Sequence, residues 1–425
     1  MSFFYRLGCL DILICILATK ANREHAISRL ANKDGEMKMK KYLNYYVRNF
    51  DYPLFFTYLF LCLFGLVMIY SSSIMVSIVD KDTPTFYYRK QLMNLIVAAF
   101  AFFVGAFIPY KHFSNKRIMQ IMTALVLILL AWVKIKGVEA GGAESWTNLG
   151  VMNFQPSEFA KLFIILYFAG AFYRKSLNNP MENLEPNNIV YPILVWLVII
   201  GFVGTEVDLG AVLILSGIAI AVVAASGIQF KKFIKFFTVL IVLGTAMLGL
   251  LILIKGDGLL TDNRIGRIKA FLNPFEYESG SSYQVINGYI AIGSGGLEGV
   301  GLGQSIQKLG YLPEPQTDFI MAIIAEELGI LGVIIVLGGL GFIVFRALTI
   351  ALKTKDPLAR MIAAGIGSWI AVQSFVNLGG LSGLIPLTGV TLPFISYGGT
   401  SILILSFAMG VLVNVSMYVK LEKKL

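Results

Sequence analysis

Charged residues are scarce in this 425-residue sequence: they make up 14% of it, whereas apolar residues make up 57% and the mean hydropathy is +0.75. A soluble globular domain is about a quarter charged. A water-soluble core of this size would not bury so much apolar side chain, so lipid must solvate the remainder. Lysine and arginine number 35 against 25 acidic residues. We interpret this excess as basic cytoplasmic loops of a membrane protein, not as a nucleic-acid-binding surface.

Histidine and cysteine are nearly absent as well. The two histidines are His25 and His112, and the three cysteines are Cys9, Cys15 and Cys62. None of them falls in a segment that we predict below to lie on the outer side of the membrane. No disulfide framework is expected there, and histidine-based metal binding and acid–base chemistry are excluded. Any catalysis on that side must use carboxylates, lysine or arginine.

Apolar segments near or above the lower limit of about 17 residues for a membrane span follow one another along most of the chain. Basic residues gather in alternate connections between them and in both flanks, and the positive-inside rule makes these parts cytoplasmic. The alternation requires an even number of spans, so we predict an all-α, polytopic membrane protein of about ten helices with both termini in the cytoplasm. The segments are 53–76, 91–109, 118–135, 158–173, 189–204, 208–226, 233–254, 319–345, 359–379 and 399–419.

This topology places four stretches outside: 77–90, 136–157, 255–318 and 380–398. The third, between helices 7 and 8, is too long for a simple connection, which favours a functional role. Residues 1–36 differ in character, because their apolar run is short and contains Asp11. We interpret them as an optional extension or a misplaced start, and 37–425 as one membrane domain.

Asp318 is the sharpest single candidate. It comes directly before the eighth segment and after the Pro-rich run YLPEPQT. One interpretation is catalytic; the other is a helix-start carboxylate that complements the helix dipole. Glu326 and Glu327 lie deeper, about 12 Å along the same helix at ~1.5 Å per residue. Acids at membrane depth normally face a partner or a cavity, and structural ion pairs are the alternative.

Glu158 and Lys161 are candidate partners of Asp318, since both belong at the outer end of the fourth segment. Their i,i+3 spacing puts them on one helix face, after the helix-start signal Gln155-Pro156. The simpler interpretation is a local ion pair, which is worth only tenths of a kcal/mol.

The long outer loop begins with a basic cluster that includes Arg264 and Arg267. Six glycines between 293 and 303 follow, and they either let backbone amides approach a phosphate or simply allow tight packing. The run 385–400, IPLTGVTLPFISYGGT, is too rich in proline and glycine for a regular spanning helix. Irregular backbone at membrane depth is tolerated where it lines a cavity. We therefore predict a polar pocket on the outer side.

These runs together resemble the SEDS family of cell-wall polymerases, the group of FtsW, RodA and SpoVE. The resemblance covers nearly all of 50–420. Its motifs are GLVMIYSSS at 65–73, GGAESWTNLG at 141–150, QPSEFAK at 155–161, VDLGAVLIL at 207–215, FLNPFEYESGSSYQ at 271–284, AIGSGGLEGVGLGQSIQKLGYLPEPQTDF at 291–319, AEELGILG at 325–332 and TGVTLPFISYGGTS at 388–401. The run at 375–399 is similar to the septal branch, FtsW of Gram-positive bacteria.

The resemblance implies a peptidoglycan glycosyltransferase that polymerises lipid II on the outer face of the bacterial cytoplasmic membrane, at the division septum. The implied partners are lipid II, the nascent glycan chain, a class B penicillin-binding protein and other divisome membrane proteins. A divalent cation, Mg²⁺ or Mn²⁺, is the expected cofactor, with its ligands unknown. Asp318 matches the proposed catalytic carboxylate and Glu158 with Lys161 the acidic–basic pair. The residues expected to bind substrate are Trp146, Arg264, Arg267, Lys308 and Ser396.

One departure limits this transfer of roles. Many family members carry a basic residue immediately before the tryptophan that corresponds to Trp146, where this chain has Ser145. A phosphate contact that depends on that base is not carried over. Three alternative functions stay open: an elongation polymerase of the RodA type, a lipid II flippase, and a scaffold that only recruits the transpeptidase. A flippase would place its essential charges near the membrane midplane, and Glu326 and Glu327 keep that alternative alive.

Overall fold

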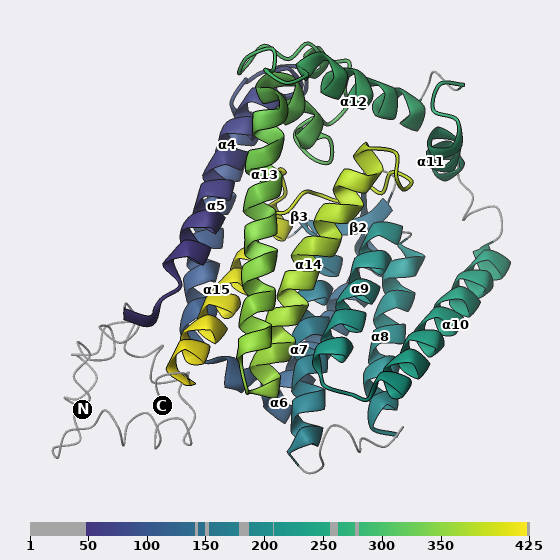
Figure 1. The fold of residues 1–425 in the computed structure, drawn as a ribbon. Helices are drawn as coiled ribbons and strands as arrows, with labels where there is room; N and C mark the ends of the chain where they lie inside the picture. Colours follow the sequence, from purple (N-terminus) through teal and green to yellow (C-terminus); the bar gives the residue numbers. More distant parts are fainter. Residues whose placement is uncertain are drawn as a thin grey trace, which may run out of the picture.

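The structure is a computed structural model, and it describes residues 48–140, 143–148, 153–177, 187–206, 208–255, 262–276 and 280–422. The predicted extension 1–36 lies outside these residues. Ten long helices dominate the described part, and each covers most of one predicted segment (Figure 1). The prediction of an all-α, polytopic fold is confirmed. The helices are α4 (Tyr52–Lys81), α5 (Phe86–Phe107), α6 (Lys116–Lys136), α7 (Pro156–Ser176), α8 (Asn187–Thr205), α9 (Leu209–Ala225), α10 (Phe230–Lys255), α13 (Ile320–Lys353), α14 (Pro357–Leu381) and α15 (Gly399–Glu422).

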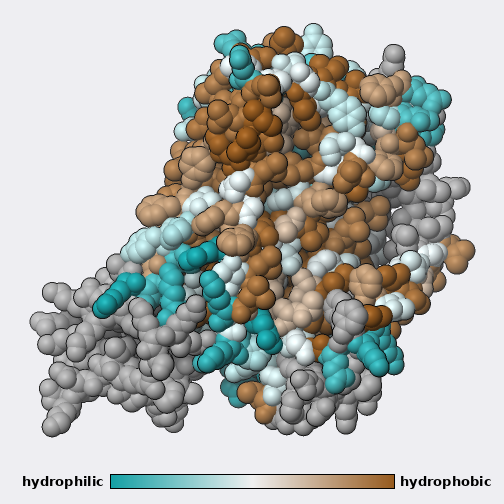
Figure 2. Space-filling model, viewed as in Figure 1, coloured by the Kyte–Doolittle hydropathy of each residue, from teal (hydrophilic) through white to brown (hydrophobic). Residues whose placement is uncertain are grey.

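The surface of the helix bundle is apolar where a soluble protein would be polar. Six described helices, α4, α5, α6, α13, α14 and α15, are long and apolar enough to cross a membrane, and shorter apolar stretches lie in α8, α9 and α10. Large apolar side chains point outward, such as Phe100 at 69% and Ile135 at 76% exposure. In Figure 2 hydrophobic residues cover the middle of the visible face and hydrophilic ones gather at its two ends. Lipid is the solvent that such a surface requires.

α7 lies in the interior of the bundle, packed against α6, α9 and α14. Most of its residues are buried, including the charged Glu158 and Lys161. Close approach between helices depends on small residues at defined positions. On α5 and α15, for example, a Cβ at Gly105 would lie 2.4 Å from the Phe407 carbonyl oxygen, and one at Gly410 would lie 2.0 Å from the Phe102 carbonyl oxygen. This reciprocal pair lets the two backbones touch.

α13 is broken in its N-terminal third, at Gly329, whose φ is 60° and ψ is −151°. The break frees the carbonyls of Glu326 and Glu327, which accept hydrogen bonds from the backbone amides of Val300 (2.9 Å) and Gly301 (3.0 Å) in the outer loop. Every polar backbone group at membrane depth must find a partner inside the protein, and the loop supplies it here. The outer loop is therefore built into the top of α13.

The predicted outer stretches are structured. The loop 255–318 contains α11 (Asp262–Leu272), α12 (Ser281–Gly295) and the short 3₁₀ helix η4 (Gln307–Leu309). A small antiparallel sheet, which the sequence analysis did not predict, joins β1 (Val138–Ala140), β2 (Ala143–Asn148) and β3 (Asn153–Phe154) in the order β1-β2-β3. Another 3₁₀ helix, η1 (Tyr110–Ser114), connects α5 to α6. The sheet leads directly into the start of α7, where the candidate residues begin.

Candidate active site

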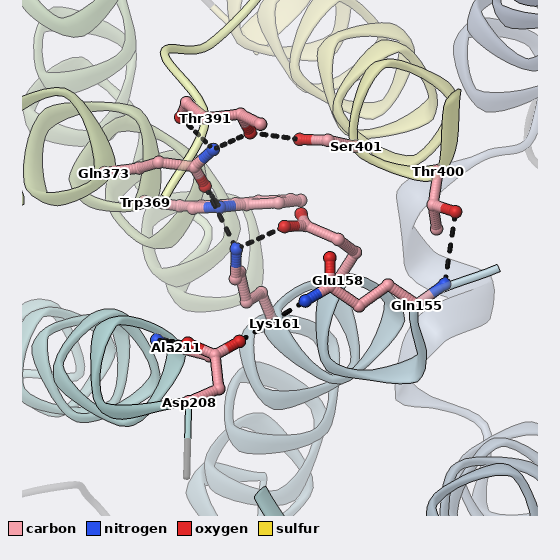
Figure 3. Close-up of polar contacts among 10 residues, drawn as sticks. All are labelled: Gln155, Glu158, Lys161, Asp208, Ala211, Trp369, Gln373, Thr391, Thr400 and Ser401. Carbon is pink, nitrogen blue, oxygen red and sulfur yellow. Dashed lines mark hydrogen bonds and ion pairs between the residues drawn. The ribbon is translucent and has the colours of Figure 1, made fainter. Parts of the chain in front are cut away.

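Glu158 and Lys161 form a buried ion pair in the first two turns of α7. Pro156 starts this helix, because its fixed φ suits the first turn and its missing N–H has no helical partner to lose. Lys161 Nζ lies 2.7 Å from Glu158 Oε1, and the two residues are 1% and 4% exposed (Figure 3). A charge pair this deep is stable only when further polar groups satisfy it. Lys161 Nζ accordingly also donates to Gln373 Oε1 of α14, at 3.2 Å.

Asp208 stands beside this pair and is a site residue that the sequence analysis did not select. It caps the N-terminus of α9, where Oδ1 accepts a hydrogen bond from the Ala211 amide at 2.9 Å. Oδ2 accepts from Gln155 Nε2 at 3.3 Å, which ties the start of α9 to the start of α7. Glu158, Lys161 and Arg267 are all within electrostatic range of its carboxylate. Its only sequence signal was its place in VDLGAVLIL, where it reads as an ordinary helix cap.

Asp318 lies two residues before α13, partly buried. Burial raises the pKa of its carboxyl group to about 6, and the Glu314 carboxylate also raises that pKa. The Thr317 hydroxyl, which donates to Oδ1 at 3.0 Å, and the Arg267 guanidinium act in the opposite direction. A carboxylate whose pKa lies near the working pH is suited to accept and release a proton.

Arg267, from α11, comes to the same place. A Cβ built on Gly389 would lie 3.9 Å from Arg267 Nη2 and 3.9 Å from Asp318 Oδ2, so both groups meet at this glycine. Gly389 belongs to 385–400, the irregular segment that we predicted to line a pocket. A hydrogen bond from the Tyr397 amide to the Gln316 carbonyl, 2.9 Å long, joins the same irregular segment to the residues that precede Asp318. The structure thus brings together Asp318, Arg267 and the irregular segment. Asp208 lies within electrostatic range of both Arg267 and Lys161, and so connects the two groups of residues.

The four other predicted residues come from different elements, and one of them, Arg264, is only partly described. Trp146 is half-buried on β2, opposite Val138 of β1. Arg264 belongs to α11, one turn before Arg267, and its side chain is not among those that the structure describes. Ser396 is buried, and its hydroxyl accepts the Leu392 amide at 2.8 Å inside a turn.

Lys308 is the fourth, and it belongs to a second buried cluster at the break in α13. Its Nζ lies 2.6 Å from Glu327 Oε1 and donates to Ser71 Oγ at 3.0 Å. Glu326 accepts hydrogen bonds from the Ser305 hydroxyl and from the Ile306 amide. Both deep glutamates are therefore held by protein groups, which supports the structural interpretation of Glu326 and Glu327. Through these contacts Lys308 anchors the outer loop to α13 and α4. Its role in binding substrate stays a prediction.

The glycine-rich loop shows the packing that was one of its two interpretations. A Cβ at Gly295 would lie 2.0 Å from the Ala325 carbonyl oxygen, and one at Gly299 would lie 2.4 Å from the Glu327 carbonyl oxygen. Gly293, Gly296 and Gly303 have open space around the same position. Close packing against α13 thus explains two of the six glycines.

A divalent cation finds no dedicated cage here. Among the residues that the structure describes, no group of three or more His, Cys, Asp or Glu side chains is placed to hold a metal ion. Mg²⁺ in enzymes of phosphorylated substrates is commonly held by one or two carboxylates together with the phosphates. The described residues do not fit a cation held by protein ligands alone.

Taken together, the site combines a carboxyl group with a raised pKa, a guanidinium, and a buried ammonium–carboxylate pair. The carboxylate can accept a proton from a hydroxyl group, and the two cations can stabilise a phosphate that leaves.

Comparison with known proteins supports the family resemblance that the sequence motifs indicated. The family model described as "Cell cycle protein", that of FtsW, RodA and SpoVE, matches residues 52–421. The chain is 42% identical over 380 residues to the probable peptidoglycan glycosyltransferase FtsW of Bacillus subtilis, covering 88% of this chain and 92% of that protein. It is 36% identical to stage V sporulation protein E of the same organism, covering 85% of this chain and 95% of that protein.

Solved structures share the fold. RodA of Thermus thermophilus matches with a TM-score of 0.61 and 24% identity, covering 86% of this chain and 96% of that chain. A chain from a peptidoglycan synthase complex, studied for the coordination of polymerization and crosslinking, matches with a TM-score of 0.66 and 25% identity. That match covers 87% of this chain and 98% of the other.

Proposed function

The chain belongs to the FtsW, RodA and SpoVE family, and from this membership we propose that it is a peptidoglycan glycosyltransferase of the FtsW type. It is a multi-pass membrane protein that polymerises lipid II into glycan strands on the outer face of the cytoplasmic membrane. Its similarity to probable FtsW proteins favours a role in septal cell-wall synthesis over the elongation role of RodA. The observation that carries the mechanism is the meeting of Asp318 with Arg267 at Gly389.

In the proposed reaction, two lipid-linked sugars react at this site. Asp318 accepts the proton of the 4-hydroxyl group of the acceptor sugar, and the oxygen attacks the anomeric carbon of the donor with inversion. The new C–O bond forms as the bond from that carbon to the lipid diphosphate breaks, and the diphosphate leaves with the electron pair. General base catalysis of this kind contributes about 10²–10⁴-fold in rate.

The positive groups of the site serve the leaving diphosphate. Arg267 offers a planar guanidinium, which suits phosphate oxygens, and Lys161 adds a compact charge. Glu158 orients Lys161 through the 2.7 Å ion pair. Trp146, Arg264, Lys308 and Ser396 stay proposed substrate contacts. A divalent cation, Mg²⁺ or Mn²⁺, would enter with the diphosphate and supply further positive charge, since the described residues form no cage for it.

The decisive experiment is polymerisation of purified lipid II in detergent with Mg²⁺ or Mn²⁺. Wild type should produce glycan chains, and Asp318→Asn should fold and insert normally yet lose at least 10²-fold in rate, because the amide cannot accept the proton. Asp356→Asn is the matched control: it is the same substitution at the N-cap of α14, and it keeps the oxygen that the Leu358 amide contacts at 2.9 Å. Substantial polymerisation by Asp318→Asn would refute the assignment of the base.

The same experiment separates the rival functions. Each protein is assayed alone and with a class B penicillin-binding protein, the partner that we propose from the likeness to a chain of a peptidoglycan synthase complex. No chains from well-folded wild type under any condition would favour the flippase or the scaffold. A flippase would move lipid II across vesicle membranes without joining sugars, and a scaffold would tolerate Asp318→Asn.

A further inference from the structure

α14 carries two amide side chains, Gln373 and Asn377, one helical turn apart and facing the site. They are 0% and 4% exposed. Buried amides in an apolar helix are costly unless their hydrogen bonds are made, so their partners are informative. The partners are groups of the candidate active site and of the irregular segment 385–400.

The orientation of Gln373 is determined by donor and acceptor chemistry (Figure 3). Its Oε1 accepts hydrogen bonds from Trp369 Nε1 at 2.7 Å and from Lys161 Nζ at 3.2 Å. An indole N–H and an ammonium are donors only, so they must face the carbonyl oxygen and not the amide nitrogen. The nitrogen, Nε2, then donates to the Thr391 carbonyl at 2.9 Å. Trp369 thus holds Gln373 with its acceptor directed at Lys161.

Asn377 is held through its amide nitrogen alone, because no group donates a hydrogen bond to its buried Oδ1 in the described part of the chain. Its Nδ2 donates to the carbonyl of Asp318 at 2.9 Å and to the carbonyl of Val390 at 2.7 Å. Two carbonyl acceptors use both hydrogens of the amide, so the reverse orientation would set oxygen against oxygen. Asn377 therefore connects the backbone of the proposed base to the segment that contains Gly389.

Lys161 and Asp318 are consequently both hydrogen-bonded to one helix, α14. Four residues along a helix correspond to about 6 Å, at ~1.5 Å per residue. Gln373 contacts the Lys161 side chain and Asn377 contacts the Asp318 backbone, and each also ties the irregular segment to α14 through a neighbouring carbonyl, Thr391 or Val390.

We propose that Gln373 and Asn377 are positioning residues of the glycosyl transfer, which hold Lys161 and Asp318 at a fixed separation by hydrogen-bonding them to one helix. The inference rests on the proposed function of those two residues. A displacement of about 1 Å at a reacting group costs on the order of 10²-fold in rate. Loss of either amide should therefore act on the chemical step and not on the capture of lipid II.

A matched control exists at the other end of the bundle. Asn414 on α15 is also fully buried, and it joins two segments: its Nδ2 donates to the Ala106 carbonyl at 2.7 Å and its Oδ1 accepts the Tyr110 amide at 3.1 Å. Asn414→Ala removes the same type of tether without touching Lys161 or Asp318. It measures how much of any loss comes from a weakened fold.

The test measures kcat, KM and thermal stability for lipid II polymerisation by Gln373→Ala, Asn377→Ala and Asn414→Ala, beside wild type and Asp318→Asn. We expect the first two to lower kcat about 10- to 100-fold with KM within about threefold. We expect Asn414→Ala to keep kcat within about twofold at a comparable loss of stability. Should the alanine variants fail to fold, Trp369→Phe keeps an aromatic ring of smaller volume at this position and removes the N–H that orients Gln373, and it should lower kcat several-fold.

The outcomes separate this inference from the function beneath it. Normal kcat in folded Gln373→Ala and Asn377→Ala, or in Trp369→Phe where those do not fold, would overturn the positioning role while wild type and Asp318→Asn still differ. An equal loss of kcat in Asn414→Ala would make the effect one of general stability and would also overturn it. Inactive wild type would overturn the proposed function and this inference with it.

Discussion

At the scale of single residues, Asp318 should give the enzyme its pH dependence. Burial raises the pKa of Asp318 to about 6, against an ordinary value of 3.8, and a general base must be ionised to work. We expect kcat/KM for lipid II to be level above that pH and to fall, by about tenfold per pH unit, as the pH is lowered well below 6. A pH–rate profile between pH 4.5 and 8 measures it.

Glu314→Gln supplies the control for this profile. The Glu314 carboxylate raises the pKa of Asp318, so its removal should move the acidic limb toward lower pH and leave the plateau unchanged. An acidic limb near pH 4 in wild type, or one that does not respond to Glu314→Gln, would contradict the assignment of the limb to Asp318.

The residues that sequence reasoning could select are those that are exceptional in an apolar chain. Asp318, Glu158 and Lys161 stand out because charges near membrane helices are costly, and the structure places them in one region with Arg267. Their catalytic roles stay predictions. The sequence analysis did not select Asp208, Gln373 or Asn377, because a helix-capping residue and two neutral amides carry no such signal. Their importance depends on which helices meet, which a single sequence does not show.

At the scale of elements, the sequence predicted the number of long helices, since length and apolarity suffice for that. Ends were harder to place: α13 continues to Lys353 where the prediction ended at 345, because the last turns carry Arg346 and Lys353 beyond the apolar run. The sheet β1-β2-β3 was missed, as its strands have six residues or fewer and no clear alternation. The break at Gly329 was missed too, since it depends on hydrogen bonds from the outer loop.

The close packing of α12 against α13 leads to a stability prediction at this scale. Gly295 ends α12, and a Cβ there would lie 2.0 Å from the Ala325 carbonyl oxygen, a backbone atom that cannot move aside cheaply. Gly293, on the same helix, has no atom within 4 Å of the corresponding position. We expect Gly295→Ala to lower the melting temperature markedly, through a cost of about 1–3 kcal/mol, and Gly293→Ala to leave it unchanged or slightly higher.

The melting temperatures of both variants are measured in detergent, with the remaining fraction of monodisperse protein as the signal. Because the two substitutions add the same methyl group two residues apart, differences in hydrophobicity and helix propensity cancel to a first approximation. Equal melting temperatures for the two variants would show that α12 does not pack on α13 as closely as the structure has it.

At the scale of the whole molecule, the two ends of the bundle differ in what their polar groups do. At the end where α4 begins and α15 ends (Figure 1), polar contacts join structural elements: Arg346 contacts Asp51 at 3.1 Å, Ser416 donates to the same carboxylate, and the Tyr110 hydroxyl donates to Asp356 at 2.6 Å. At the opposite end lie α11 and α12; Arg267 belongs to α11, and Asp318 comes two residues before α13. This division suits a lipid-linked substrate with a polar head, because the ionisable groups of the candidate site gather away from the end whose described polar contacts join structural elements.

This division predicts the orientation of the protein in the membrane, which the positive-inside rule sets with the basic end in the cytoplasm. Single cysteines in a variant with Cys9 and Cys15 replaced by serine test it; Cys62 is buried and stays. An impermeant maleimide added to intact cells should label Glu298→Cys in the outer loop and should label Lys116→Cys at the start of α6 only after permeabilisation, since both positions are exposed. Phe100→Cys, which faces lipid in the middle of α5, should react in neither case. Labelling of Lys116→Cys in intact cells would invert the topology and place the Asp318 site in the cytoplasm, where the proposed polymerisation on the outer face would be impossible.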